Sequence, residues 1–191
     1  MEVILASQSP RRKELLGLFH IPFVIRVPHV DETMDPALSP AQAVAQVSRA
    51  KAEAVPRQAD DVVIAADTIV VCNGQILGKP RDAQDAENML CLLSGRDHQV
   101  MTGMTVLRGD LVKTTTEITD IHFRALSNRE IKAYIRTGEP MDKAGAYGIQ
   151  GGAALFAERL VGDYYNVMGL PVCRLGQFLR EIAPEIMEES E

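Results

Sequence analysis

The chain has 191 residues, a hydrophobic fraction of 46% and a formal net charge of −6 at pH 7. This apolar content is ample for a folded core, which excludes an intrinsically disordered protein. The negative charge argues against non-specific binding to nucleic acid or to an anionic membrane surface, so a phosphate-bearing ligand needs a local cluster of basic side chains.

The first residues of the chain and the spacing of its cysteines predict a cytoplasmic protein. The first residues, Met-Glu-Val-Ile-Leu-Ala, lack the basic region and the long apolar stretch of a signal peptide. No apolar segment is long enough to span a bilayer. Cys72, Cys91 and Cys173 are widely spaced and lie within apolar stretches, so we expect free, buried thiols in a reducing compartment.

The first predicted elements are a short buried strand at residues 3–6 and a helix that begins at Ser9-Pro10 and runs to about residue 18 or 19. Ser9 is a favourable N-cap and Pro10 a favourable first helical residue. The free N–H groups of such a helix start can bind an anion. Arg11 and Arg12 in the first turn oppose the helix dipole, which favours a bound anion over a solvated basic helix end.

After a second strand candidate at residues 23–27, the adjacent carboxylates of Asp31 and Glu32 follow. They can ligate a hard cation, although an Asp-Glu pair in a loop is more often only solvated. A Ser-Pro pair at residue 39 then begins a helix with apolar residues at helical spacing. Lys51 flanks this apolar stripe, and either its stem lies along the core edge with its amine in solvent, or the amine points into a cleft.

Asp67 lies between two short apolar runs, Val-Val-Ile before it and Ile-Val-Val after it. A carboxylate in such surroundings is costly unless it is hydrogen-bonded, paired or holding a cation. Asn73-Gly74 is typical of a tight turn, which returns the chain and brings Lys79 toward Asp67. The sequence therefore predicts either an acid–base pair of a functional site or a structural ion pair.

The remaining elements follow from caps, periodicity and turn residues. In chain order they are a helix at 82–93, a strand hairpin at 99–107 and 112–123, a helix from Ser127, a last hairpin at 155–157 and 165–168, and a final helix from Pro171. The acidic segment after Pro184, which ends Glu188-Glu189-Ser190-Glu191, is typical of a solvated or frayed end.

Residues 138–152 contain five glycines among charged, aromatic and amide side chains, which excludes a regular strand or helix. This composition suits a loop whose backbone approaches a ligand closely, and it also suits a mobile surface lid. The order of elements predicts an α/β fold, with a mixed twisted sheet flanked by helices and two lobes around a central cleft.

Five motifs carry a resemblance to a known family. They are Ser7-Gln8-Ser9-Pro10-Arg11-Arg12, Ala66-Asp67-Thr68, Gly78-Lys79-Pro80, Ser-Gly-Arg-Asp-His-Gln-Val at 94–100 and Asp-Lys-Ala-Gly-Ala-Tyr-Gly-Ile-Gln-Gly at 142–151. Together they closely resemble the Maf-type nucleoside triphosphate pyrophosphatases, also called septum-formation inhibitor proteins. The resemblance runs from about residue 3 to residue 179.

The resemblance implies one domain over residues 1–191, a nucleotide-binding cleft, a divalent cation (Mg²⁺ or Mn²⁺), and cleavage of a nucleoside triphosphate to the monophosphate and pyrophosphate. It also implies a homodimer. Asp67 resembles the proton acceptor for the attacking water, and Glu32 lies toward the metal. The residues that resemble the triphosphate-holding set are Ser9, Arg11, Arg12, Lys51 and Lys79.

The long glycine loop resembles that of the branch acting on dTTP and UTP rather than the sister branch acting on 7-methylguanosine triphosphate. In the matching branch, Arg11, Thr68 and Gln150 occupy positions associated with substrate choice. Asp67 could instead bind the metal, and the sequence leaves these two roles open.

Two other functions and one other candidate base compete with this assignment. A nucleotide-binding regulator of cell division, without essential catalysis, would use the same cations and would not need Asp67. A P-loop enzyme is discounted because no Gly-x-x-x-x-Gly-Lys-Ser/Thr occurs. His98 has polar neighbours, and we assign it a structural or peripheral role rather than that of the base.

Overall fold

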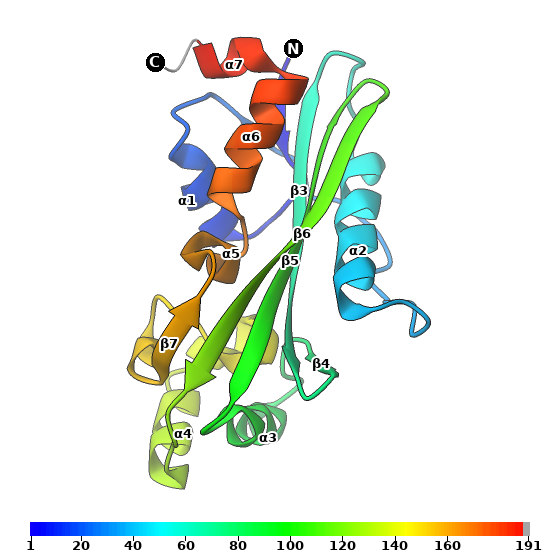
Figure 1. The fold of residues 1–191 in the computed structure, drawn as a ribbon. Helices are drawn as coiled ribbons and strands as arrows, with labels where there is room; N and C mark the ends of the chain where they lie inside the picture. Colours follow the sequence, from blue (N-terminus) through cyan, green and yellow to red (C-terminus); the bar gives the residue numbers. More distant parts are fainter. Residues whose placement is uncertain (189–191) are drawn as a thin grey trace. The chain divides into compact units, whose positions relative to one another are not determined.

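The computed structural model describes residues 1–188 as a mixed α/β fold built on a seven-stranded sheet (Figure 1). The strands are β1 (Val3–Leu5), β2 (Val24–Ile25), β3 (Val62–Cys72), β4 (Gln75–Leu77), β5 (Asp97–Arg108), β6 (Leu111–Phe123) and β7 (Ala157–Val161). The helices are α1 (Pro10–Gly17), α2 (Pro40–Ala54), α3 (Ala83–Leu93), α4 (Asn128–Ile135), α5 (Tyr164–Met168), α6 (Val172–Ile182) and α7 (Pro184–Glu188).

The strand order is β2-β1-β3-β5-β6-β7, with β4 paired to β3. β1 runs parallel to both β2 and β3, whereas β4 is antiparallel to β3 and β7 is antiparallel to β6. The prediction of a mixed sheet flanked by helices is therefore confirmed. None of the helices in the described part of the chain combines the length and apolar content that crossing a membrane requires.

The chain forms two compact units, and β3, β5 and β6 contribute residues to both. Unit 1 comprises Met1–Asp67, Thr102–Glu117 and the chain from Gly169 onward, and unit 2 comprises Thr68–Met101 and Ile118–Met168. The predicted nucleotide-binding cleft, and the assignment of one domain to the whole chain, stay predictions.

In unit 1, α2 lies on one face of the sheet, and α1 and α6 lie on the other (Figure 1). The apolar stripe of α2 and the parallel strands β1 and β3 share one core, because each element presents its apolar side to the next. That core contains Ile4, Ala6, Ala52, Val55, Val63, Ala65 and Leu107. α6 contributes a second apolar stripe, in which Leu175, Leu179 and Ile182 are buried.

Gly103 of β5 sits directly against the backbone of α2. A Cβ atom at this position would lie 2.3 Å from the carbonyl oxygen of Val44. Backbone atoms cannot rotate out of the way as a flexible side chain can, so any side chain here would push α2 off the sheet. The close packing of α2 on β5 therefore requires glycine at residue 103.

We expect Gly103→Ala to destabilise the protein by about 1–3 kcal/mol, because it overpacks a rigid contact. In a domain of this size that loss lowers Tm by roughly 2–10 °C in a thermal unfolding experiment. Gly17→Ala is the matched control, since no atom lies within 4 Å of the added Cβ. A Tm for Gly103→Ala equal to that of the control variant would contradict this account.

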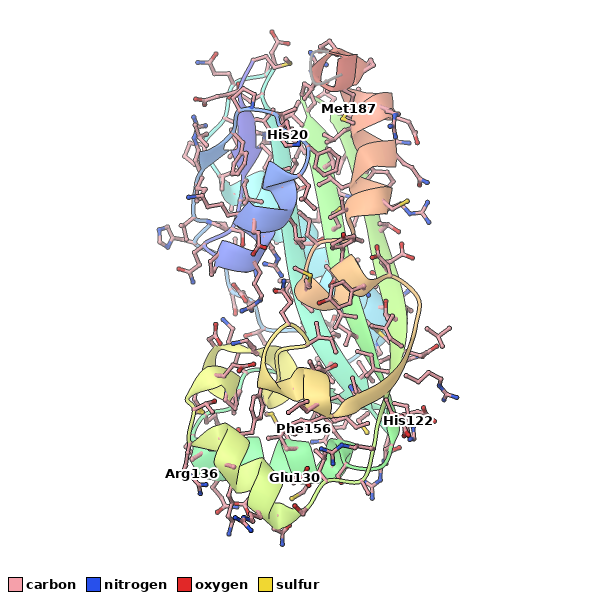
Figure 2. All side chains as sticks on the ribbon, turned by 90° about the vertical axis from the view of Figure 1, so that its left-hand side faces the viewer. His20, His122, Glu130, Arg136, Phe156 and Met187 are labelled. Atoms are coloured by element: carbon pink, nitrogen blue, oxygen red, sulfur yellow. The ribbon has the colours of Figure 1, made fainter. Side chains whose placement is uncertain are left out.

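Unit 2 is built around an aromatic cluster, which lies in one core with the buried residues of α3 and α4. Phe123, Tyr134, Tyr147 and Phe156 are buried, and neighbouring rings meet edge to face. Figure 2 shows Phe156 and Glu130 in this part of the molecule. Arg124 connects the two, because its guanidinium stacks on the Phe156 ring and donates to Glu130 Oε1 over 2.6 Å. Arg124 and the hydrogen bonds from Ser127 lower the pKa of Glu130 to about 2.

The predicted helix starts are confirmed. Ser9, Ser39, Asp82 and Ser127 each accept a backbone hydrogen bond as the N-cap of α1, α2, α3 and α4, respectively. The Asn73-Gly74 turn is also confirmed, with φ of 51° and 77° in the left-handed region. The apolar runs around Asp67, however, belong to one continuous strand, β3.

The predicted last hairpin is wrong. Residues 157–161 form β7, but its partner is β6, where Asp120 lies opposite Val161. Residues 164–168 instead form α5, since the Asp163 carboxylate accepts the N–H of Tyr165 at 2.8 Å and starts a helical turn. Asn166 is buried in α5 and donates to Val100 O and to Thr119 Oγ1.

The prediction of three buried thiols is correct only for Cys72. Cys91 and Cys173 are free but exposed. Both lie on helices, and a helix turns about 100° per residue, so a cysteine one or two residues from a buried leucine can still face solvent. The segment after Pro184 begins with the helix α7, and the expected frayed end at residues 189–191 lies outside the described residues.

Candidate functional site

The start of α1 is a turn in which two serine hydroxyls organise the backbone. Ser9 Oγ accepts the N–H of Arg12 at 3.5 Å, and Ser7 Oγ accepts the N–H of Ser9 at 3.2 Å. Ser7 is buried two residues after the end of β1, so the strand fixes the position from which the helix begins. This arrangement places the first N–H groups of α1 beside two arginine side chains.

The guanidinium of Arg12 is fixed at this helix start. Its Nε donates to the carbonyl oxygen of Gly169 at 2.8 Å, and its Nη1 donates to Ser7 Oγ at 3.3 Å. Burial lowers the pKa of Arg12, the nearby Asp67 and Glu32 carboxylates oppose this effect, and the neighbouring charge of Arg11 adds to it. A guanidinium is still charged at neutral pH after such a shift. A positive charge is thus held in a defined orientation.

Lys51 of α2 lies between two carboxylates. Its Nζ is 2.7 Å from Asp67 Oδ1 and 3.0 Å from Glu32 Oε1. The lysine is only 7% exposed, whereas the side chain of Glu32 is 60% exposed. This low exposure excludes the interpretation in which the Lys51 amine lies in solvent. The two carboxylates compensate for the burial of its ammonium group.

The same carboxylates are suited to a divalent cation together with a phosphate ligand. Glu32 and Asp67 place two oxygens within 3.0 Å of one positive atom. Mg²⁺ sites in proteins often use one or two carboxylates and complete the shell with water and substrate phosphates. Among residues 1–188, no group of three or more His, Cys, Asp or Glu side chains could hold a metal ion by itself. The donor set therefore fits a cation whose remaining ligands come from water and from a substrate.

The predicted partner of Asp67 was Lys79, and the ion pair that the structure describes for Asp67 is with Lys51. Asp67 is the last residue of the first segment of unit 1, whereas Thr68 and Lys79 belong to unit 2. Within unit 2 the predicted return strand is present, since Val70 lies opposite Leu77. Lys79 follows that strand and is exposed. A pairing of Lys79 with Asp67 stays a prediction.

The glycine-rich segment contains three short 3-10 turns, η1 (Glu139–Asp142), η2 (Ala144–Ala146) and η3 (Gly152–Leu155). Gln150 lies in the turn before η3 and is exposed. Tyr147 anchors the segment, because its hydroxyl is 2.9 Å from His98 Nε2. Burial lowers the pKa of His98 to about 4. His98 is buried in the core, which fits the structural role that the sequence assigned to it.

Four residues that shape these sites have no role assigned to them from the sequence. Ser7 and the carbonyl of Gly169 orient Arg12, and Tyr134 and Glu139 hold the glycine-rich segment. A carboxylate that precedes a run of glycines is a signal that could have indicated Glu139. The partnership of Arg12 with Gly169 spans 157 residues of sequence and has no local signal.

Comparison with known proteins gives a consistent result. A model of the Maf-like protein family matches residues 2–182. Proteins named dTTP/UTP pyrophosphatase from Symbiobacterium thermophilum and Alkaliphilus metalliredigens are 52% and 50% identical to this chain. Each alignment covers 94% of this chain, and 93% and 95%, respectively, of the relatives.

A solved structure of a HAM1 protein from Coxiella burnetii has a similar fold, with a TM-score of 0.50 and 14% identity over 95% of this chain and 99% of that one. At this identity the likeness concerns the fold alone. Sequence similarity over nearly the whole length is what decides the family: this chain belongs to the Maf-like proteins.

Proposed function

We propose that this protein hydrolyses dTTP and UTP to the monophosphate and pyrophosphate, as a housekeeping enzyme of the nucleotide pool that depends on Mg²⁺ or Mn²⁺. The observation that carries the proposal is the Arg12 guanidinium, fixed at the start of α1 close to the charges of Asp67 and Glu32. Family membership and the names of the relatives support the choice of reaction.

The basic residues are assigned to the triphosphate. A triphosphate with one bound Mg²⁺ still carries about two negative charges, so several cations must converge on it. The proposed phosphate-holding residues are Ser9, Arg11, Arg12 and Lys51 of unit 1 and Lys79 of unit 2.

Asp67 is assigned to the attacking water. Its carboxylate takes a proton as the water oxygen bonds to the α-phosphorus, while the bond to the bridging oxygen breaks and pyrophosphate leaves with the electron pair. Arg12 and Lys51 lie where they can stabilise negative charge on the phosphoryl oxygens. The 2.7 Å contact with Lys51 fixes the direction of the Asp67 carboxylate before substrate arrives.

Glu32 is the residue that would hold the metal ion, and Asp67 would join it if its carboxylate acts as a metal ligand. When bound, the ion neutralises phosphate charge and orients the triphosphate. The alternative role of Asp67, as a metal ligand rather than the proton acceptor, is part of this proposal and is tested below.

Gln150 is assigned to the base, with Arg11 and Thr68 as further determinants of substrate choice. A pyrimidine with a 2,4-dioxo edge offers two carbonyl acceptors and one N–H donor, and the Gln150 amide offers both a donor and an acceptor. Within residues 1–188, no hydrogen bond ties this amide to the loop. That observation favours base reading over a role in fixing the loop.

We expect Gln150→Leu to remove the preference for dTTP and UTP selectively. The unmodified protein should prefer these nucleotides over dATP and dGTP by ~10²-fold or more in kcat/KM, because a site built for a polar edge rejects a ligand that leaves it unpaired. The check is kcat/KM for all four nucleotides in both proteins. A uniform loss for every nucleotide would show that Gln150 only holds the loop.

The proposed reaction is tested by product analysis over a panel of nucleotides. The protein should release pyrophosphate from dTTP and UTP when Mg²⁺ or Mn²⁺ is present and should stop when the metal is chelated. The panel includes dCTP, dATP, dGTP and 7-methylguanosine triphosphate. Release of inorganic phosphate instead of pyrophosphate would refute the assignment, and nucleotide binding without turnover would favour a regulator of cell division.

Two further parts of the proposal concern where the protein acts and in which form. It is assigned to the cytoplasm on its first residues and its widely spaced cysteines, and it is expected from the family resemblance alone to act as a homodimer. Light scattering coupled to gel filtration tests the second assignment, because a mass near 20.9 kDa would show a monomer.

A further inference from the structure

The carboxylate of Glu139 is hydrogen-bonded to the helix that precedes it and to the loop that follows it. Its Oε1 accepts the hydroxyl of Tyr134 at 2.9 Å, and its Oε2 accepts the backbone N–H of Gly152 at 3.1 Å. Both oxygens of the carboxylate therefore bind groups of unit 2. Hydrogen bonds to a charged acceptor are about twice as strong as those between neutral groups, so this contact restrains the loop backbone.

Tyr134 extends the connection to the other side of Gln150. Its ring is buried under the loop, and its hydroxyl oxygen accepts the N–H of Gly148 at 3.0 Å. Burial foremost, and also the contact with Glu139, raise the pKa of Tyr134, so its hydroxyl stays a donor at neutral pH. A chain of hydrogen bonds thus runs from Gly148 through Tyr134 and Glu139 to Gly152. Gln150 lies midway between its two ends.

The glycines of the loop leave room for these two side chains. A Cβ atom at Gly151 would lie 2.0 Å from Glu139 Oε1, and one at Gly152 would lie 3.1 Å from the Tyr134 ring. The backbone of Glu139 is held in turn, because its carbonyl oxygen accepts Lys143 Nζ at 2.7 Å. The glycines that the sequence associated with close approach to a ligand thus also permit close approach to Glu139.

We propose that Glu139, acting through Tyr134, is the positioning residue for the base-reading loop. It touches neither substrate nor reacting atoms; it fixes the backbone on both sides of Gln150, so that the Gln150 side chain extends from one defined backbone position. This inference rests on the proposed assignment of Gln150 to the pyrimidine base. Preorganisation of this kind matters because a shift of about 1 Å in a recognition group can cost 10²-fold in rate.

Tyr134→Phe and Glu139→Ala test the inference, with Tyr165→Phe as the control. Tyr134→Phe keeps the buried ring and removes only the hydroxyl, while Tyr165 is an exposed tyrosine of the same unit. We expect both test variants to lower the ratio of kcat/KM for dTTP to that for dGTP by ~10-fold, through KM for dTTP. Glu139→Gln keeps two polar atoms at the same place and should restore part of this ratio.

Hydrogen exchange supplies a readout that does not depend on activity. The N–H groups of Gly148 and Gly152 should exchange faster in Tyr134→Phe and Glu139→Ala than in the control. Each variant removes the acceptor of one of these N–H groups and the group that holds the acceptor of the other. Unchanged exchange, or an equal loss of activity toward all nucleotides in proportion to a lowered Tm, would overturn the inference.

The same measurements separate this inference from the proposed function. If the unmodified protein shows no preference for dTTP, the base-reading role of Gln150 fails, and the positioning role for specificity fails with it, whatever the exchange data show. If Gln150→Leu abolishes the preference while Tyr134→Phe and Glu139→Ala leave it intact, only the positioning role is wrong.

Discussion

Asp67→Asn should lower kcat for dTTP hydrolysis by at least ~10²-fold while nucleotide still binds, because the amide keeps the shape of the carboxylate but cannot accept the proton. The measurements are the rate of pyrophosphate release and, separately, the affinity for a non-hydrolysable nucleotide analogue. Asp60→Asn is the matched control, since Asp60 is an exposed carboxylate of the same unit. A kcat for Asp67→Asn close to that of the control would refute the catalytic assignment.

The same variant separates the two roles of Asp67. If Asp67 is the proton acceptor, the affinity for Mn²⁺ in the presence of the nucleotide analogue should change little, because Glu32 and the phosphates remain. If it is a metal ligand, that affinity should fall together with kcat. Electron paramagnetic resonance of free Mn²⁺ measures the difference without turnover.

Arg12→Ala should cost roughly 2–4 kcal/mol in kcat/KM, as expected for the loss of a charge-assisted phosphate or transition-state contact. The guanidinium is held by Gly169 O and Ser7 Oγ, so no rearrangement is needed when substrate binds. Arg12→Lys should recover little, since an ammonium cannot reproduce the planar fork. The loss in kcat/KM is measured with dTTP at saturating metal.

Arg49→Ala is the control for Arg12→Ala. Arg49 is an exposed arginine of α2 whose pair with Glu53, one helical turn away, contributes little in solvent. Lys79→Ala should behave like Arg12→Ala if Lys79 joins the phosphate-holding residues. Equal losses from Arg12→Ala and Arg49→Ala would mean that net charge, rather than a defined site, governs the reaction.

Local signals account for the parts of the fold that the sequence predicted. A helix start depends on residues within three positions of the cap, which is why Ser9, Ser39 and Ser127 were recognisable. The α/β class follows from alternating apolar periods, and the family from five motifs now supported by a match over residues 2–182. Short apolar segments carry less information, so residues 165–168, which lie in α5, were mistaken for a strand.

The site was predictable as a set of residues but not as a set of contacts. Lys51 was placed on the flank of a helix, yet nothing near it in the sequence indicates that its amine meets both Asp67 and Glu32. Those three residues come from a helix, a strand and a loop. The packing of α2 on the sheet brings Lys51 to Asp67, and the path of the loop before α2 adds Glu32. Glu139 escaped notice for the opposite reason, because its contacts are local but depend on turns that glycine composition does not specify.

The hydrogen bond between Arg12 and Gly169 can form only late in the synthesis of the chain, because its two partners are 157 residues apart. Every segment of unit 2 has been synthesised before Gly169 leaves the ribosome, whereas unit 1 is assembled from segments at both extremes of the described chain. Chains fold as their segments become available, so a nascent chain of residues 1–168 can complete unit 2 first. It already carries the Ser9 cap, but not the carbonyl that aims the guanidinium. Truncated products of interrupted translation therefore lack the carbonyl group that orients Arg12.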